Sequence, residues 1–213
     1  MTAIVLHDYW RSSAAYRVRI ALGLKGLLWE SRSVDLVAGE QRSASHKELS
    51  PLGLVPVLEI DGLRLTQSLA IIDYLDARFP DPALVSPDPA VRAQTLARAL
   101  TVAADIHPIN NLSVTDYLRA ELGAGQEQVL RWMHHWMHRG FAALERDAPA
   151  AGLFGGDRAD LADVCLVPQM YNARRWQVEL VDYPRLLRID ADLRKIPAFA
   201  AAAPEAVKAP DQG

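Results

Sequence analysis

The sequence predicts an α/β domain with the element order βαβαββα, followed by an all-helical domain. Three observations predict this class. In the first part of the chain, short β-branched runs alternate with stretches whose apolar residues recur at helical spacing. A proline-rich segment, 79–89, then interrupts the pattern, and only helical spacing follows it. We therefore expect domains at 1–80 and 90–213, joined by a linker at 81–89.

The first domain is expected to contain four short strands and three helices. Asp61–Gly62 lies between two of the strand-like runs and is a strong hairpin signal. Gly26 follows the first helix as its C-cap, and Ser68 is expected to be the N-cap of the last. Strands are expected at 4–7, 28–36, 57–60 and 63–65, helices at 13–25 and 68–78, and a short helix or turn at 41–49.

The second domain is expected to be helical throughout, with helices at 91–106, 112–122 and 126–146. Asp160 and Asp163 have the spacing of a capping box, in which the first carboxylate accepts from the backbone of the second. An apolar run, 164–167, follows them. We interpret this pair as a folding signal for a buried helix.

Composition excludes several functional classes. The 213-residue chain has a formal net charge of −3, whereas proteins that bind nucleic-acid phosphates are usually strongly basic. The start of the chain does not have the pattern of a secretory signal, and no apolar run reaches membrane-spanning length. The single cysteine, Cys165, excludes an intramolecular disulfide and a multi-cysteine metal cluster. We expect a cytoplasmic protein with no nucleic-acid or membrane partner.

The histidine-rich stretch 134–138 is not expected to bind a metal ion. His134 and His138 are four residues apart and share one helix face. A zinc site needs more ligands than these two provide. We interpret the stretch as a surface or interface stripe.

Val55–Pro56 lies directly before an expected strand. In a βαβαββα domain this placement suggests the thioredoxin fold with a cis Val55–Pro56 bond. A cis bond there is expected to turn the backbone N–H and C=O of Val55 outward, where an extended peptide can pair with them. The alternative is a trans proline that begins a strand, the commoner state of such bonds.

Five segments, spread in order over nearly the whole chain, resemble the zeta-class glutathione transferases, which include maleylacetoacetate and maleylpyruvate isomerases. Gln67–Ser68 alone is common to many glutathione transferases, whereas the Ser-Ser pair together with the segment 107–113 is more specific. The resemblance implies the glutathione transferase fold, glutathione as the cofactor and a homodimer. The segments are 11–22 (RSSAAYRVRIAL), 55–56, 67–72, 106–113 and 161–169.

The resemblance assigns Ser12 the main catalytic role, with Ser13 in support. Glutathione reacts as a thiolate, but a free thiol has a pKa of roughly 8.5. A hydroxyl at a helix start can donate a hydrogen bond to sulfur, and the helix end adds positive potential. Lowering the thiol pKa by about two units corresponds to roughly 2.7 kcal/mol. The alternative is that both serines only cap the helix.

The resemblance also implies a glutathione site in a cleft between the domains. Ser68 and Gln67 are expected to hold the γ-glutamyl carboxylate, and Val55 to pair with the tripeptide backbone. The cofactor-binding residues expected in this way are Gln41, Val55, Gln67, Ser68, His107 and Asn111. The two walls are expected to carry Ser12, Val55 and Ser68 on one side and His107, Asn111 and Arg175 on the other.

The family reaction begins with attack of the glutathione thiolate on the cis double bond of a dicarboxylate. The charge is delocalised as an enolate, the former double bond rotates, and expulsion of the thiolate leaves the trans isomer. A dianionic substrate and an enolate both need cationic partners. Arg11, beside the serines, is one candidate, and Arg175 matches an arginine of the family, whereas Arg174 is interpreted as part of a solvated face.

Two departures from the family pattern are relevant. Ala14 stands where many members have cysteine, so the protein itself supplies no thiol chemistry there. Leu54 stands where a glutamine is usual, which removes a polar contact to glutathione.

We expect isomerisation of maleylacetoacetate, in the breakdown of aromatic amino acids, with maleylpyruvate as the close alternative. Glutathione conjugation or dehalogenation of small α-halo acids is a second enzymatic alternative. A catalytically silent glutathione-transferase-like binding protein is the non-enzymatic alternative. The retained Ser12–Ser13, Gln67–Ser68 and Arg175 argue against that last reading.

Overall fold

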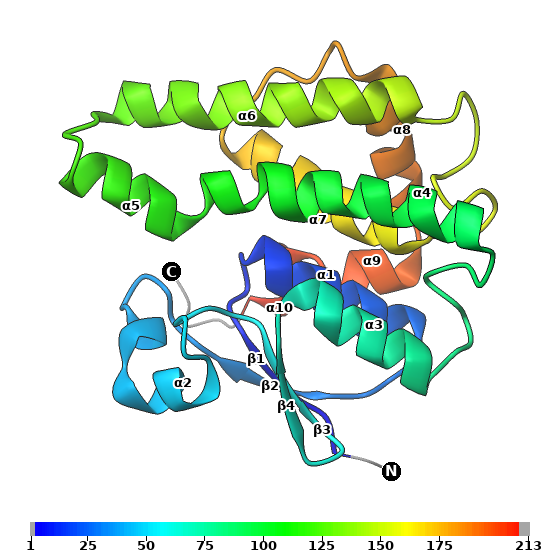
Figure 1. The fold of residues 1–213 in the computed structure, drawn as a ribbon, viewed down its shortest axis with the longest axis horizontal. Helices are drawn as coiled ribbons and strands as arrows, with labels where there is room; N and C mark the ends of the chain where they lie inside the picture. The colour runs from blue at the N-terminus through cyan, green and yellow to red at the C-terminus, as the bar shows by residue number, and fades with distance from the viewer. Residues whose placement is uncertain (1–2, 209–213) are drawn as a thin grey trace. The chain divides into compact units, whose positions relative to one another are not determined.

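The computed structural model describes residues 3–208, and they form two compact units (Figure 1). The first unit comprises the described residues of Met1–Leu84 and Lys195–Gly213, and the second is Val85–Arg194. The boundary between the units, at Leu84 and Val85, lies within the linker expected at 81–89. Residues 195–208 belong to the first unit, although the second domain was expected to extend from 90 to the end of the chain.

The first unit is built on a four-stranded sheet with the order β2-β1-β3-β4. β1 runs parallel to β2 and antiparallel to β3, and β4 is the antiparallel partner of β3. The mixed sheet and the βαβαββα order confirm the predicted thioredoxin-like domain. The strands are β1 (Val5–Asp8), β2 (Glu30–Ser33), β3 (Val57–Ile60) and β4 (Leu63–Thr66).

Helices α1 (Ser13–Leu24) and α3 (Ser68–Arg78) pack against each other and cover one face of this sheet (Figure 1). Their buried apolar side chains supply the core of the unit, because the apolar residues of α1 and α3 face the buried strands β1 and β3. The C-cap of α1 is Lys25, not the expected Gly26, which follows it with φ at 64°. The shorter η1 (Glu40–Arg42) and α2 (Ala44–Leu49) follow β2.

The C-terminal segment returns to α1 through the short helices α9 (Pro197–Ala201) and α10 (Pro204–Val207). The Tyr16 hydroxyl donates to the Phe199 carbonyl at 3.3 Å. Arg19, which is 1% exposed, donates to the Ala202 carbonyl at 3.0 Å and forms an ion pair with Asp8 at 2.6 Å. Burial raises the pKa of the Asp8 carboxyl, and the Arg19 charge acts against that rise.

The second unit is helical, as predicted. Its helices are α4 (Pro89–Leu100), α5 (Leu112–Ala120), α6 (Gln126–Asp147), α7 (Leu161–Arg175) and α8 (Pro184–Leu193). The expected helix 91–106 continues from α4 into a π-helical segment, η2 (Thr101–Ile106), before the turn η3 (Pro108–Asn110). Gly140 of α6 packs directly against Ile106, where a Cβ atom would lie 2.3 Å from the isoleucine side chain.

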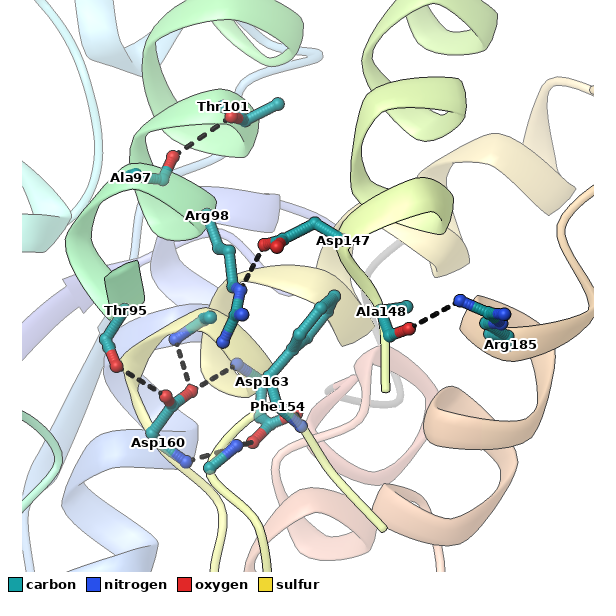
Figure 2. A network of polar contacts seen from close by, with 12 residues as sticks. Thr95, Ala97, Arg98, Thr101, Asp147, Ala148, Phe154, Asp160, Asp163 and Arg185 are labelled. Atoms are coloured by element: carbon teal, nitrogen blue, oxygen red, sulfur yellow. Dashed lines mark hydrogen bonds and ion pairs between the residues drawn. The ribbon is translucent and has the colours of Figure 1, made fainter. Parts of the chain in front are cut away.

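The start of α7 has the predicted capping box (Figure 2). Asp160 accepts from the backbone nitrogens of Ala162 and Asp163 at 2.8 and 3.1 Å. The buried Asp163 carboxylate in turn accepts from Phe154, Gly155 and Asp160 at 3.0–3.1 Å. Burial, together with the neighbouring Asp160 charge, raises the pKa of Asp163 to about 7.

Further polar contacts tie α4 and α6 to the same region (Figure 2). The Thr95 hydroxyl donates to Asp160 at 2.8 Å, and Arg98 pairs with Asp147. Among the described residues, no helix is both long and apolar enough to cross a membrane.

Candidate functional site

The turn between β1 and α1 places Ser12 and Ser13 at the start of a helix. Ser12 is the N-cap, and its Oγ accepts from the Ala15 backbone nitrogen at 3.2 Å. Ser13 is the first helical residue and is buried. The first turn of α1 carries no acidic side chain, so the positive potential of the helix end is not neutralised there. A hydroxyl that accepts through a lone pair still has its own hydrogen to donate, so capping and thiolate stabilisation are compatible in Ser12.

Arg11 is held beside these serines by two aromatic residues. Its Nη2 donates to the Tyr9 hydroxyl at 2.9 Å, and its guanidinium carbon lies 4.6 Å from the centroid of the Trp10 ring. Cation–π contact of this kind favours a fixed position for a partly exposed guanidinium. The turn that leads to Ser12 therefore holds a permanent positive charge against Tyr9 and Trp10.

The start of α3 differs from the expectation in its cap. Gln67, not Ser68, is the N-cap, and it has φ at 66° without a side-chain capping bond. Ser68 is the first helical residue and is 6% exposed. Its hydroxyl does not cap the helix but accepts from Nη1 of Arg17, on the neighbouring α1, at 3.2 Å.

Sequence reasoning missed Arg17. Its side chain is 2% exposed, and a guanidinium has only donors, so the bond must run from Arg17 to Ser68. The Ser68 hydrogen is thereby left to donate elsewhere, at a helix start that favours anions. The sequence did contain one signal for this role, which is a charged residue inside an otherwise apolar helical stretch. An arginine that is buried in this way normally has a structural or binding partner.

The loop between α2 and β3 holds the expected peptide-pairing segment. Val55–Pro56 is a cis bond, which confirms the prediction. Two hydrogen bonds fix Leu54: its backbone nitrogen donates to Ser50 Oγ at 3.1 Å, and its carbonyl accepts from His46 Nε2 at 3.1 Å. The geometry of this loop therefore depends on side chains that lie before it in the chain.

Gln41 lies against the same loop. It is 6% exposed, and its Nε2 donates to the Leu36 carbonyl at 3.5 Å. Its Oε1 is buried without a hydrogen-bond partner within residues 3–208. Gly53, with φ at 64°, passes so close that a Cβ atom there would lie 2.8 Å from the Gln41 carbonyl oxygen. A buried acceptor beside a tightly packed glycine suits the N–H group of a bound peptide.

Three expected residues belong to the second unit. Asn111 is the N-cap of α5, and its Oδ1 accepts from the Ser113 nitrogen at 3.0 Å. His107 follows η2 and precedes η3, and it is partly exposed. Arg175 lies exposed in the last turn of α7, with its guanidinium 4.9 Å from the Trp176 ring centroid. A role for these residues in a shared cleft stays a prediction.

Arg174 has a different environment from the one expected. It is exposed, but its guanidinium pairs with the fully buried Asp190 at 2.5 Å. Burial raises the pKa of Asp190, and the Arg174 charge opposes that rise. Arg174 therefore has a structural partner that Arg175 does not share.

The histidine stripe of α6 makes hydrogen bonds within its own unit. His134 Nε2 donates to the Trp176 carbonyl at 2.8 Å, and His138 Nδ1 is hydrogen-bonded to the Tyr183 hydroxyl at 2.7 Å. Within the described part of the chain, no group of three or more histidine, cysteine or acidic side chains is arranged to hold a metal ion.

The first unit thus has two helix starts that favour anions, joined by the Arg17–Ser68 bond, and a cis-proline loop with a buried peptide acceptor. This combination defines the glutathione-binding domain of a glutathione transferase. The family model for the N-terminal domain of glutathione S-transferases matches residues 11–78. The chain belongs to the glutathione transferase family, in the zeta-class group of maleylacetoacetate and maleylpyruvate isomerases.

Similar proteins cover nearly the whole chain. A probable maleylacetoacetate isomerase of Vibrio cholerae is 52% identical over 210 residues, which are 96% of this chain and 97% of the relative. A maleylacetoacetate isomerase of Rhizobium meliloti is 49% identical over 96% of this chain and 97% of its own length.

Solved structures agree with this assignment. A bacterial zeta-class maleylpyruvate isomerase is 40% identical, covers 98% of this chain and 100% of its own, and superposes with a TM-score of 0.93. A maleylacetoacetate isomerase of Anaeromyxobacter dehalogenans, solved with glutathione in its active site, is 42% identical with a TM-score of 0.87 and covers 100% of this chain and 99% of its own.

Proposed function

We propose that this protein is a glutathione-dependent isomerase that converts maleylacetoacetate to its fumaryl isomer. The observation that carries the proposal is the Ser12 hydroxyl at the N-terminus of α1, whose first turn has no acidic residue, with Arg11 as the preceding residue of the same turn. Relatives named maleylacetoacetate isomerase match this chain over almost their full length. The support is therefore both local chemistry and whole-chain similarity.

The residues of the first unit suit glutathione. Ser68 and the start of α3 offer donors to its γ-glutamyl carboxylate, with the Arg17 charge directly behind the hydroxyl. Gln41 Oε1 offers a buried acceptor to a peptide N–H. Val55 lies at the cis bond where the tripeptide backbone is proposed to pair. Gln67 is exposed at the same helix start, where its side chain can reach the ligand.

When bound, glutathione supplies the nucleophilic thiolate that adds reversibly to the cis double bond. The protein has three tasks in that chemistry. Ser12 donates a hydrogen bond that keeps the sulfur ionised, with Ser13 and the helix end adding to the stabilisation. Arg11 offers positive charge to the substrate carboxylate or to the enolate oxygen. Arg175 is proposed to add a further positive charge to the binding of the dianionic substrate.

Maleylpyruvate is the second candidate substrate. It is favoured by the TM-score of 0.93 to a zeta-class maleylpyruvate isomerase. Both substrates have a cis double bond conjugated to a carbonyl, so the same residues serve either reaction. His107 and Asn111 are proposed to complete the glutathione site in both cases.

We further propose that the protein is cytoplasmic, that it forms a homodimer, and that it acts in the breakdown of aromatic amino acids. The single cysteine, Cys165, is buried and forms no disulfide, which suits a reducing compartment.

The test is a spectrophotometric assay with purified protein and maleylacetone, run with and without glutathione. We expect an absorbance change whose rate requires both the protein and the thiol. Absence of any thiol-dependent rate with maleylacetone and with both natural dicarboxylates would favour the silent binding protein or the conjugating enzyme. Conjugation of α-halo acids in the same preparation would separate those two.

A further inference from the structure

The indole of Trp10 lies against a cation from each of two segments that are far apart in sequence. The Arg11 guanidinium carbon is 4.6 Å from the ring centroid, and the Lys208 ammonium nitrogen is 4.7 Å from it. The two charges are therefore at most about 9.3 Å apart. Contacts with an aromatic face attract both cations and hold them near the same ring.

The position of Lys208 is fixed by the packing of the C-terminal segment. Arg19 donates to the carbonyls of Trp10 and Ala202, both at 3.0 Å, so one buried side chain joins the Trp10 turn to that segment. The buried Pro204 begins α10, and the Lys208 backbone nitrogen donates to the Pro204 carbonyl at 3.0 Å. Lys208 thus caps α10, which packs on α9, and α9 in turn packs on α1.

Neither cation is neutralised by the described part of the chain. In residues 3–208, Arg11 and Lys208 form no ion pair with a carboxylate, whereas Arg19, close by, is paired with Asp8. Two unneutralised charges near one another repel, and an anion that contacts both relieves that repulsion. Arg11 directly precedes Ser12 in the chain, so one cation of the pair belongs to the turn that leads to the proposed thiolate site.

We propose that Lys208 is a specificity-determining residue of the isomerase and binds the substrate carboxylate that is remote from the reacting double bond. This inference rests on the proposed function and deepens it. Arg11, next to Ser12, serves the reacting end, and Lys208 serves the other end. The pair selects dicarboxylates over monocarboxylates, because a substrate with one carboxylate gains nothing from the second cation.

The test compares Lys208→Gln with wild type on a dicarboxylate, maleylpyruvate or maleylacetoacetate, and on the monocarboxylate maleylacetone. We expect the dicarboxylate KM to rise about three- to fivefold, the effect of losing one exposed ion pair. The kcat and the maleylacetone KM should change by less than about twofold. Lys208→Arg should behave like wild type because it keeps the charge.

Lys195→Gln is the matched control, since it removes the same charge from the same segment, and it should leave both KM values unchanged. An unchanged dicarboxylate KM in Lys208→Gln overturns the proposal. An equal rise for both substrates also overturns it, because the effect is then not specific to the second carboxylate.

A binding experiment separates this inference from the proposed function. Wild type and Lys208→Gln, each saturated with glutathione, are titrated calorimetrically with succinate and with butyrate. Preferential binding of succinate that disappears in the variant supports the Lys208 subsite even if no turnover is seen. Equal succinate affinity in the two proteins overturns it, whereas absent turnover alone contradicts only the isomerase assignment.

Discussion

Replacement of Ser12 separates two roles of a single hydroxyl. In the structure, its oxygen accepts the Ala15 N–H at 3.2 Å and so caps α1. Removing a serine cap costs about 1 kcal/mol when alanine replaces it, but only a few tenths when glycine does. Ser12→Ala and Ser12→Gly both lose the hydroxyl, so they differ in stability and not in the donor offered to sulfur.

The catalytic loss can be estimated from the same geometry. Lowering the thiol pKa by about two units is worth roughly 2.7 kcal/mol. The helix end, which has no acidic residue in its first turn, accounts for about 0.3–1 kcal/mol of this. Roughly 2 kcal/mol remains for the hydroxyl, or about 1.5 pKa units. Losing it raises the pKa of the bound thiol from about 6.5 to about 8, so the thiolate fraction, and kcat with it, falls about eightfold near pH 7.

The assay is kcat for maleylacetone with saturating glutathione, combined with urea unfolding of each variant. We expect Ser12→Ala and Ser12→Gly to lose turnover equally, Ser12→Ala to be less stable by about 1 kcal/mol, and Ser12→Thr to keep both properties. The deficit should shrink above about pH 9, where the thiol ionises unaided. Normal turnover in Ser12→Gly would refute the reasoning and move the role to Ser13 or to a backbone N–H.

Three other substitutions test further parts of the account. Arg17→Met removes the donor to Ser68 and should raise the KM for glutathione about tenfold, which is the lower end of the energy range for a hydrogen bond to a charged group. An unchanged KM contradicts this role, and urea unfolding checks that the variant is folded. Arg175→Ala should raise the KM for dicarboxylates, and a normal KM would show that Arg175 does not bind the dianion. Asp163 has a pKa raised from 3.8 to about 7, so its contribution to stability is present below pH 3.8 and is lost as the pH rises through about 7. The difference in unfolding free energy between wild type and Asp163→Asn should therefore fall over that range, by up to about 1.4 kcal/mol per pH unit, and a rise with pH would contradict the raised pKa.

Features specified by neighbouring residues were predictable from the sequence. The capping box at Asp160 and Asp163 depends on a three-residue spacing, and the hairpin at Asp61–Gly62 depends on residues that tolerate positive φ. Ser12 was identified as a helix-start residue for the same reason. The α/β order of the first unit follows from the alternation of apolar periods along the chain.

Features that depend on tertiary contacts were not predictable in this way. The Ser68 hydroxyl was expected to cap its own helix, but it accepts a hydrogen bond from Arg17 of another helix instead. The return of the C-terminal segment to α1 depends on the buried Arg19, whose partners at Asp8 and Ala202 are distant in sequence. Propensity and spacing contain no information about such partners, so only the folded structure reveals them.

Sequence similarity added what local patterns do not contain. The identity of the ligand and the proposed role of Arg175 as a substrate contact come from the resemblance to zeta-class enzymes. The same resemblance distinguishes Arg175 from the adjacent Arg174, and the structure adds that Arg174 forms an ion pair with Asp190.

The most direct measurement is an ultraviolet difference titration of the glutathione thiol bound to this protein, with Ser12→Gly measured in parallel. We expect the bound thiol to ionise about two pKa units below the free value of roughly 8.5, and most of that shift to disappear in Ser12→Gly. A bound thiol that ionises at the free value in wild type would contradict the claim that α1 and Ser12 stabilise a thiolate.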